Sequence, residues 1–190
     1  MQHAQKRLIL ASGSPRRREL LAGMGYAFEI CTPDVDEHVP GKASDIVRTL
    51  AVRKAHAARP MYDSGIIIAS DTLVSIEGIP LGKPRDALDA KWMLLALSGR
   101  EHDVFTGVCI LDAASGRESV RTERTGVCFR ALSEREIDDY IATGEPMDKA
   151  GAYAIQGGAG RFVQNLNGSF ENVMGFPVEA VREMLKEFGL

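Results

Sequence analysis

The segment from Leu8 to Leu21 describes a strand, a tight turn and a helix in direct succession, which is the repeating unit of an α/β fold. Residues 7–11 form the strand-like apolar stretch, and Ser12-Gly13-Ser14 is typical of a turn. A helix over residues 15–24 follows, because Ser14 suits the N-cap position and Pro15 suits the first helical position. The chain therefore begins with a strand that passes straight into a helix.

Three consecutive arginines occupy the first turn of that helix, where the helix dipole disfavours cations. Arg16 and Arg17, the Ser12 and Ser14 hydroxyls and the free backbone N–H groups together offer many donors to phosphate oxygens. The segment alone leaves two interpretations open. It is either a phosphate-binding turn or a solvated basic start of a helix.

Strand-like and helix-like runs alternate along the rest of the chain, which predicts an α/β fold with a mixed central sheet and flanking helices. A glycine-rich stretch over 146–176 shows little periodicity and is typical of binding loops. We expect a single domain over residues 1–190. The expected strands cover 66–69, 73–76, 79–81, 103–111 and about 119–130, and the expected helices cover 44–58, 86–97 and a last helix from Pro177 to Gly189. Glu77-Gly78 is expected as a two-residue hairpin turn, and Ser133 to Glu136 has the spacing of a capping box that opens a helix to about residue 142.

Composition excludes several classes of partner and site. The net charge of -3 gives no overall basic field, so we expect neither nucleic acid nor a membrane surface as a partner. No run of about 18 apolar residues and no signal-peptide pattern occurs, which predicts a cytoplasmic location. Cys31, Cys109 and Cys128 have no C-x-x-C spacing and are expected to be small core residues. The four histidines, His3, His38, His56 and His102, are expected on the surface or in structural hydrogen bonds.

Asp71 is the strongest catalytic candidate. It comes directly after the buried-strand run 66–69, and we expect it at the carboxyl end of that strand, where an unpaired charge would be costly. A carboxylate there can hold Mg²⁺ against substrate phosphates or accept a proton from an attacking water. An aspartate that only caps a turn is the alternative.

Two lysines are candidates for contact with an anion. Lys54 continues the apolar face of the helix 44–58, four residues after Leu50, so its ammonium either reaches out to solvent or meets an anion. Lys83 lies in Gly82-Lys83-Pro84, which fails as a Walker A motif because proline replaces the Ser or Thr that would meet Mg²⁺. It is either a point charge for phosphate or a solvated lysine.

An acidic cluster at Asp34, Asp36 and Glu37 offers oxygen ligands to a metal, although such clusters also occur in solvated loops.

Seven short motifs follow one another along nearly the whole chain. They are Leu10-Ala11-Ser12-Gly13-Ser14-Pro15-Arg16-Arg17, Val35-Asp36-Glu37, Ala69-Ser70-Asp71-Thr72, Gly82-Lys83-Pro84, Leu97-Ser98-Gly99, Asp148-Lys149-Ala150-Gly151-Ala152-Tyr153-Ala154-Ile155-Gln156-Gly157 and Asn172-Val173-Met174-Gly175-Phe176-Pro177. Each motif is weak evidence alone, but the series is specific. In this series the chain resembles the Maf family of nucleotide pyrophosphatases, once described as septum formation inhibitors.

The resemblance implies a cytosolic, metal-dependent hydrolase that cleaves a nucleoside triphosphate between its α and β phosphates. It also implies a fold similar to inosine triphosphate pyrophosphatase, with two lobes around a cleft. Asp71 resembles the family's catalytic base. Arg16, Thr72 and Gln156 resemble the residues that set substrate choice, and Lys54, Lys83 and Lys149 resemble its phosphate-facing lysines. On this basis we expect Mg²⁺ or Mn²⁺ to be held by Asp71 and Glu37, with Ser12, Ser14 and Arg17 also binding the triphosphate.

Three residues choose between branches of the family. The branch that acts on 7-methyl-GTP tends to carry Trp, Gln and Glu where this chain has Arg16, Thr72 and Gln156. An amide suits the single N–H of thymine and uracil between two carbonyls, whereas a carboxylate suits the paired donors of guanine. The expected substrates are therefore dTTP and UTP. Hydrolysis of 7-methyl-GTP or another purine nucleotide, and a nucleotide-binding regulator of cell division, are the alternatives, and a homodimer stays open.

Overall fold

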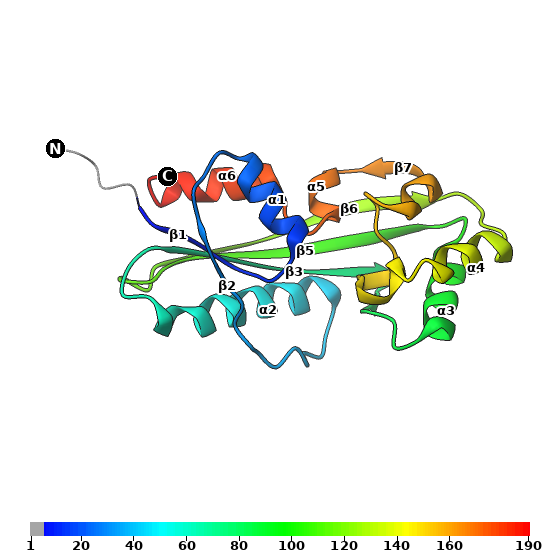
Figure 1. Ribbon diagram of the computed structural model, residues 1–190, viewed down its shortest axis with the longest axis horizontal. Coiled ribbons are helices and arrows are strands. Elements are labelled where there is room, and N and C mark those ends of the chain that lie inside the picture. Colours follow the sequence, from blue (N-terminus) through cyan, green and yellow to red (C-terminus); the bar gives the residue numbers. More distant parts are fainter. Residues whose placement is uncertain (1–5) are drawn as a thin grey trace.

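The computed structural model describes residues 6–190 and is built around one mixed, seven-stranded sheet (Figure 1). The strands are β1 (Leu8–Ala11), β2 (Glu29–Cys31), β3 (Ile66–Ile76), β4 (Ile79–Leu81), β5 (Glu101–Asp112), β6 (Glu118–Phe129) and β7 (Val163–Asn167). The α-helices are α1 (Pro15–Gly23), α2 (Ala43–Ala58), α3 (Ala87–Leu97), α4 (Glu134–Ala142), α5 (Phe170–Val173) and α6 (Val178–Glu187). Short 3₁₀ turns are η1 (Arg59–Met61), η2 (Glu145–Asp148), η3 (Ala150–Ala152) and η4 (Gly158–Phe162).

The sheet combines a parallel part and an antiparallel part. Its strand order is β2-β1-β3-β5-β6-β7, and β4 pairs with β3 beside this path. The strands β2, β1 and β3 are parallel because helices connect them, whereas β4 and β5 run antiparallel to β3, and β6 runs antiparallel to β5. The pairs β3–β4 and β5–β6 are hairpins. The predicted mixed α/β sheet with flanking helices is confirmed.

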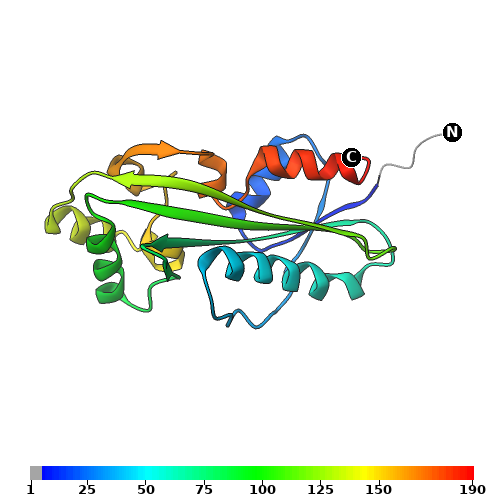
Figure 2. The same ribbon diagram turned by 180° about the vertical axis from the view of Figure 1, so that it is seen from behind.

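Helices cover both faces of the sheet at the end that contains β1. Figures 1 and 2 show α2 on one face and α1 and α6 on the other. Side chains of β1 alternate accordingly: Leu8 and Leu10 pack in the cluster that contains α6, and Ile9 and Ala11 pack in the cluster that contains α2. Burial on both faces explains why this strand is apolar without a polar interruption.

A second lobe forms where β3, β5 and β6 continue beyond α1 and α2. Here Val74 and Val104 from the long strands pack with Leu94 of α3 and Tyr140 of α4. The strands β3, β5 and β6 therefore extend through both lobes. Where they pass between the two hydrophobic cores, they can carry polar side chains.

One long strand replaces two expected strands. Residues 66–69 and 73–76 belong to the single strand β3, which pairs with β5 without a break from Ile66 to Ser75. The expectation that Asp71 ends a strand is therefore wrong, since Asp71 lies inside β3 and pairs with Gly107. Backbone pairing does not depend on side-chain polarity, so the polar residues at 70–72 interrupt the apolar pattern and not the strand.

The turn and capping motifs predict the secondary structure more accurately than the periodicity of apolar residues does. The hairpin turn at Glu77-Gly78 has positive φ at both residues, 50° and 82°, as a two-residue turn of type I′ requires. The capping box of Ser133 and Glu136 opens α4 as predicted. The stretch 146–176, expected as loops, also holds the strand β7, the short helix α5 and the 3₁₀ turns η3 and η4.

The histidines and cysteines are mainly structural. His38 and His56 are exposed and His102 is buried, whereas His3 lies outside the described residues. Cys31 and Cys109 are buried as expected, but Cys128 is half-buried because it lies on a strand face that the core does not fully cover. Within residues 6–190, none of the helices combines the length and apolar character needed to cross a membrane.

At Gly107 the strand β5 lies against the backbone of α2, and we expect Gly107→Ala to lower the free energy of unfolding by about 3 kcal/mol. A Cβ atom at this position would lie 2.3 Å from the Val47 carbonyl oxygen, and that backbone belongs to a packed helix. Urea denaturation measures the change. Gly23→Ala is the control, because a Cβ there meets no atom within 4 Å. Equal stability of the two variants would contradict this packing.

His102 makes folding stability depend on pH. Its Nε2 lies 2.9 Å from the Tyr153 hydroxyl, and burial lowers the pKa of His102 to about 4. In the unfolded chain the pKa is near 6.5, so between these values only the unfolded chain takes up the proton. The stabilisation is therefore complete above pH 6.5 and is lost as the pH falls towards 4, by about 3 kcal/mol in total.

The pH dependence is measured by urea denaturation at pH 7.5 and pH 4.5. We expect His102→Gln to flatten the difference between the two pH values, and His38→Gln, on an exposed histidine, to leave it as in the wild type. An unchanged difference in His102→Gln would show that other groups cause it.

Candidate active site

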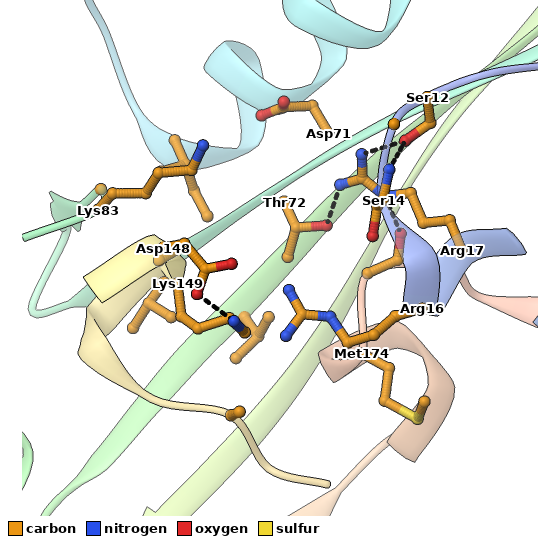
Figure 3. Close-up of a pocket in the computed structure, with 18 of the residues that line it drawn as sticks. Ser12, Ser14, Arg16, Arg17, Asp71, Thr72, Lys83, Asp148, Lys149 and Met174 are labelled. Carbon is orange, nitrogen blue, oxygen red and sulfur yellow. Dashed lines mark hydrogen bonds and ion pairs between the residues drawn. The ribbon is translucent and has the colours of Figure 1, made fainter. Parts of the chain in front are cut away.

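A cavity of about 910 Å³ lies over the middle of the long strands and is lined by residues of both lobes (Figure 3). Its size is within the range that accepts a small organic ligand. Eleven residues to which the sequence assigned a chemical role line this one cavity, whereas Asp34 and Asp36 of the acidic cluster do not. These eleven residues are Ser12, Ser14, Arg16, Arg17, Glu37, Lys54, Asp71, Thr72, Lys83, Lys149 and Gln156.

The turn between β1 and α1 forms one wall. Ser12 is buried, and its Oγ accepts hydrogen bonds from the Ser14 backbone N and from Arg17 Nη1, each at 3.2 Å. Ser14 stands at the N-cap position as predicted, but its side chain makes no capping hydrogen bond. Ser12 therefore holds the turn, and the N-terminus of α1 keeps free N–H groups at the cavity.

Arg17 ties three parts of the chain together. Its Nε donates to the Gly175 carbonyl at 2.9 Å, and its Nη2 donates to Thr72 Oγ1 at 3.3 Å, in addition to the bond to Ser12. Burial lowers the pKa of Arg17, and the nearby Asp71 carboxylate opposes that shift. The guanidinium thus fixes the β1–α1 turn against β3 and against the loop after α5.

Lys54 meets an anion, which decides between its two interpretations. Its Nζ lies 2.6 Å from Asp71 Oδ1 and 2.8 Å from Glu37 Oε1, and its side chain is only 14% exposed. The hydrogen bond from Lys54 is the main reason that the pKa of Glu37 is lower than usual. One ammonium therefore brings the predicted catalytic carboxylate and the predicted second acidic residue to the same point.

Basic side chains from the second lobe complete the cavity. Lys83 is exposed in the loop after β4, and Lys149 forms an ion pair with Asp148 between η2 and η3. Figure 3 shows the side chains of Arg16 and Lys149 close together in the cavity, on the side of Thr72 away from Asp71. Gln156 is exposed and lines the same cavity. Cations from both lobes therefore surround the cavity, whereas Asp71 and Glu37 face it from one side.

Sequence reasoning assigned no role to two residues that shape this site. Asp148 belongs to one of the quoted motifs but received no role of its own. Its position beside Lys149 and before a glycine-rich stretch is a pattern that could have identified it. Thr106 lies opposite Thr72 across β3 and β5, and their hydroxyl oxygens are 2.9 Å apart. No local signal identifies Thr106, since the contact depends on the register of two strands.

The arrangement suits hydrolysis of a polyanion. Guanidinium and ammonium groups and the N-terminus of a helix are the donors that proteins use to bind phosphate. A carboxylate beside such a site can act as general base towards a water molecule. The chemistry that fits best is attack of water on a bound phosphate group.

Comparisons with known proteins agree with this geometry. Residues 7–188 match the family described as Maf-like protein. The dTTP/UTP pyrophosphatase of Pelotomaculum thermopropionicum is 48% identical over 186 residues, which cover 97% of each chain. Proteins of the same name from Bdellovibrio bacteriovorus and Anaeromyxobacter dehalogenans are 45% and 49% identical, over 95% and 96% of this chain and 98% and 94% of theirs.

Proposed function

The chain belongs to the family of Maf-like proteins, and from this premise we propose that it is a nucleoside triphosphate pyrophosphatase that hydrolyses dTTP and UTP to the monophosphate and pyrophosphate. The observation that carries the proposal is that the candidate base, the candidate phosphate ligands and the candidate specificity residues all line one cavity. Full-length relatives named dTTP/UTP pyrophosphatase support the same substrates.

The cations of the cavity hold the triphosphate. The N-terminus of α1 offers free N–H groups and carries Arg16, and Lys83 and Lys149 approach from the second lobe. These groups converge on one cavity, so a triphosphate bound there meets several positive charges at once. A triphosphate bound by these groups has its α-phosphorus between them and Asp71.

Asp71 acts as general base in the reaction. Its carboxylate accepts a proton from a water molecule while the water oxygen forms a bond to the α-phosphorus. The bond from the α-phosphorus to the oxygen that bridges to the β-phosphate breaks, and pyrophosphate leaves with that oxygen. The Lys83 and Lys149 side chains stabilise the charge that develops on the leaving group. Lys54 orients the base through its hydrogen bond to Asp71 Oδ1.

A divalent cation fits the acidic side of the cavity. Among residues 6–190 no three His, Cys, Asp or Glu side chains are placed to hold a metal, but Asp71 and Glu37 already converge on one positive group, Lys54 Nζ. One or two carboxylates with substrate phosphates are a sufficient ligand set for Mg²⁺. We therefore assign Asp71 and Glu37 as the ligands of Mg²⁺ or Mn²⁺. When bound, the metal neutralises phosphate charge and lowers the pKa of a water ligand.

Substrate choice is assigned to Arg16, Thr72 and Gln156. The Gln156 amide can both donate to a carbonyl and accept from an N–H group, which matches the edge of uracil and thymine. Guanine offers two adjacent donors and suits a carboxylate better. We therefore expect Gln156→Glu to move the preference towards purine substrates.

A panel of nucleoside triphosphates with Mg²⁺ tests the proposal. The panel contains dTTP, UTP, CTP, ATP, GTP, inosine triphosphate and 7-methyl-GTP, and the products are identified as monophosphate and pyrophosphate. We expect the largest kcat/KM for dTTP and UTP. A preference for purines would overturn the substrate assignment, and tight binding without turnover would favour a nucleotide-binding regulator.

Two further properties are proposals that rest on the sequence. They are the organisation as one domain over residues 1–190 and a cytoplasmic location. The sequence leaves a homodimer open, and analytical ultracentrifugation measures the oligomeric state directly.

A further inference from the structure

Three oxygen atoms form a row that runs from the cavity into the interior. Thr72 Oγ1 lies 2.9 Å from Thr106 Oγ1, and Thr106 Oγ1 lies 3.0 Å from the backbone carbonyl oxygen of Asn172. Thr106 is fully buried and Asn172 is 1% exposed, so solvent cannot replace either contact. Both distances are those of O–H···O hydrogen bonds.

The direction of the hydrogen bonds follows from the number of protons. Each threonine hydroxyl has one proton, and the Asn172 carbonyl can only accept. Both contacts contain a proton only if Thr72 donates to Thr106 and Thr106 donates to Asn172. The opposite direction would leave two oxygen lone pairs facing each other at 3.0 Å in a buried place, which is costly.

Arg17 occupies one of the two acceptor positions of the Thr72 hydroxyl oxygen. Its Nη2 donates to Thr72 Oγ1 at 3.3 Å and therefore occupies one of the two lone pairs of this oxygen. The proton of Thr72 is directed to Thr106, so one lone pair is left. Since Thr72 lines the cavity, its hydroxyl can only accept a hydrogen bond from a ligand.

The inner end of the row is rigidly held. Asn172 Nδ2 donates to the Val104 carbonyl at 3.2 Å and to Thr125 Oγ1 at 3.0 Å. The Asn172 backbone N donates to Ser169 Oγ at 3.1 Å, which caps α5. These bonds hold Asn172 in place, so its carbonyl stays in position to accept the hydrogen bond from Thr106.

We propose that Thr106 is a positioning residue that makes Thr72 a hydrogen-bond acceptor, so that the site selects a ligand whose nucleoside part offers a donor to Thr72. This inference rests on the proposed function. Ionised phosphate oxygens carry no proton and do not fit an acceptor. The donors of UTP and dTTP are the N3–H group of the base and the hydroxyl groups of the sugar, whereas N3 of cytosine is an acceptor.

Kinetics of the wild-type enzyme show whether the base or the sugar supplies the donor to Thr72. Values of kcat/KM are compared for UTP, for CTP, which has no N3–H group, and for 3′-deoxy-UTP, which has no 3′-hydroxyl group. We expect a loss of about tenfold or more for CTP if the base is the donor, and for 3′-deoxy-UTP if the sugar is the donor. Equal values for all three substrates would overturn the inference without any variant.

Two variants at Thr106 test its role. Thr106→Val keeps the shape but removes the acceptor of the Thr72 proton, which is then free to turn into the cavity. The preference found in the wild type should fall by about tenfold in this variant, mainly through KM, whereas Thr106→Ser, which keeps the hydroxyl, should retain it. Thermal unfolding confirms that each variant is folded.

The outcomes separate this inference from the proposed function. A Thr106→Val enzyme with the wild-type preference, or a Thr106→Ser enzyme that loses it, would show that the hydroxyl row does not set the polarity of Thr72. A wild-type protein that hydrolyses neither UTP nor dTTP would overturn the proposed function and this inference with it.

Discussion

Asp71→Asn is expected to lower kcat for pyrophosphate release from dTTP by about 1,000-fold or more. The change keeps the size of the side chain and removes its basicity and its charge. Asp71 lies inside β3, where pairing with β5 on one side fixes its backbone, so the variant should fold as the wild type does. The rate is measured with saturating dTTP and Mg²⁺.

The matched control is Asp63→Asn, which makes the same change at an exposed position outside the cavity. It should leave kcat unchanged. A non-hydrolysable dTTP analogue should still bind to Asp71→Asn, because the cations that hold the triphosphate are intact. Turnover at the wild-type rate in Asp71→Asn would rule out this carboxylate as the base.

Lys54→Met is expected to lower kcat/KM by about 100-fold. Lys54 contacts both Asp71 and Glu37, at 2.6 and 2.8 Å, and methionine leaves these two carboxylates without the shared cation. Mutual repulsion should then turn Asp71 away from the orientation in which it faces the substrate. Steady-state kinetics with UTP measure the loss.

Lys91→Met provides a close comparison. Lys91 also bridges two carboxylates, at 3.2 Å to Glu134 and 2.8 Å to Asp138, but on the surface of α3 and α4. Its loss should leave activity unchanged. In Lys54→Met the pKa of Glu37, followed by NMR, should rise towards the usual value, because the hydrogen bond from Lys54 is the main cause of its lowering. Full activity of Lys54→Met would mean that the ion pair has no part in the reaction.

The parts of the fold that could be predicted are those fixed by local chemistry. The strand, turn and helix at Leu8–Leu21, the turn at Glu77-Gly78 and the capping box at Ser133 depend on neighbours in the chain. The continuity of β3 and the existence of β7 depend on pairing with β5 and β6, which lie far away in the sequence. Polar residues in a long paired strand and a short exposed strand leave no clear periodic pattern.

The candidate site shows the same division. Residue types and local patterns identified the candidates Ser12, Ser14, Arg16, Arg17, Glu37, Lys54, Asp71 and Lys83. The resemblance to a family added Thr72, Lys149 and Gln156 and chose between the alternatives. The contacts that orient them could not be predicted, because Lys54 meets Asp71 across two elements and Arg17 reaches the Gly175 carbonyl from the other end of the chain. The row from Thr72 to Asn172 depends on strand register and on the position of α5.

Hydrolysis of UTP in water enriched in oxygen-18 shows which phosphorus atom the water attacks. Mass spectrometry or phosphorus NMR of the products locates the label. Because we propose attack on the α-phosphorus, we expect one labelled oxygen in UMP and none in pyrophosphate. Label in pyrophosphate, or formation of UDP and inorganic phosphate, would contradict it.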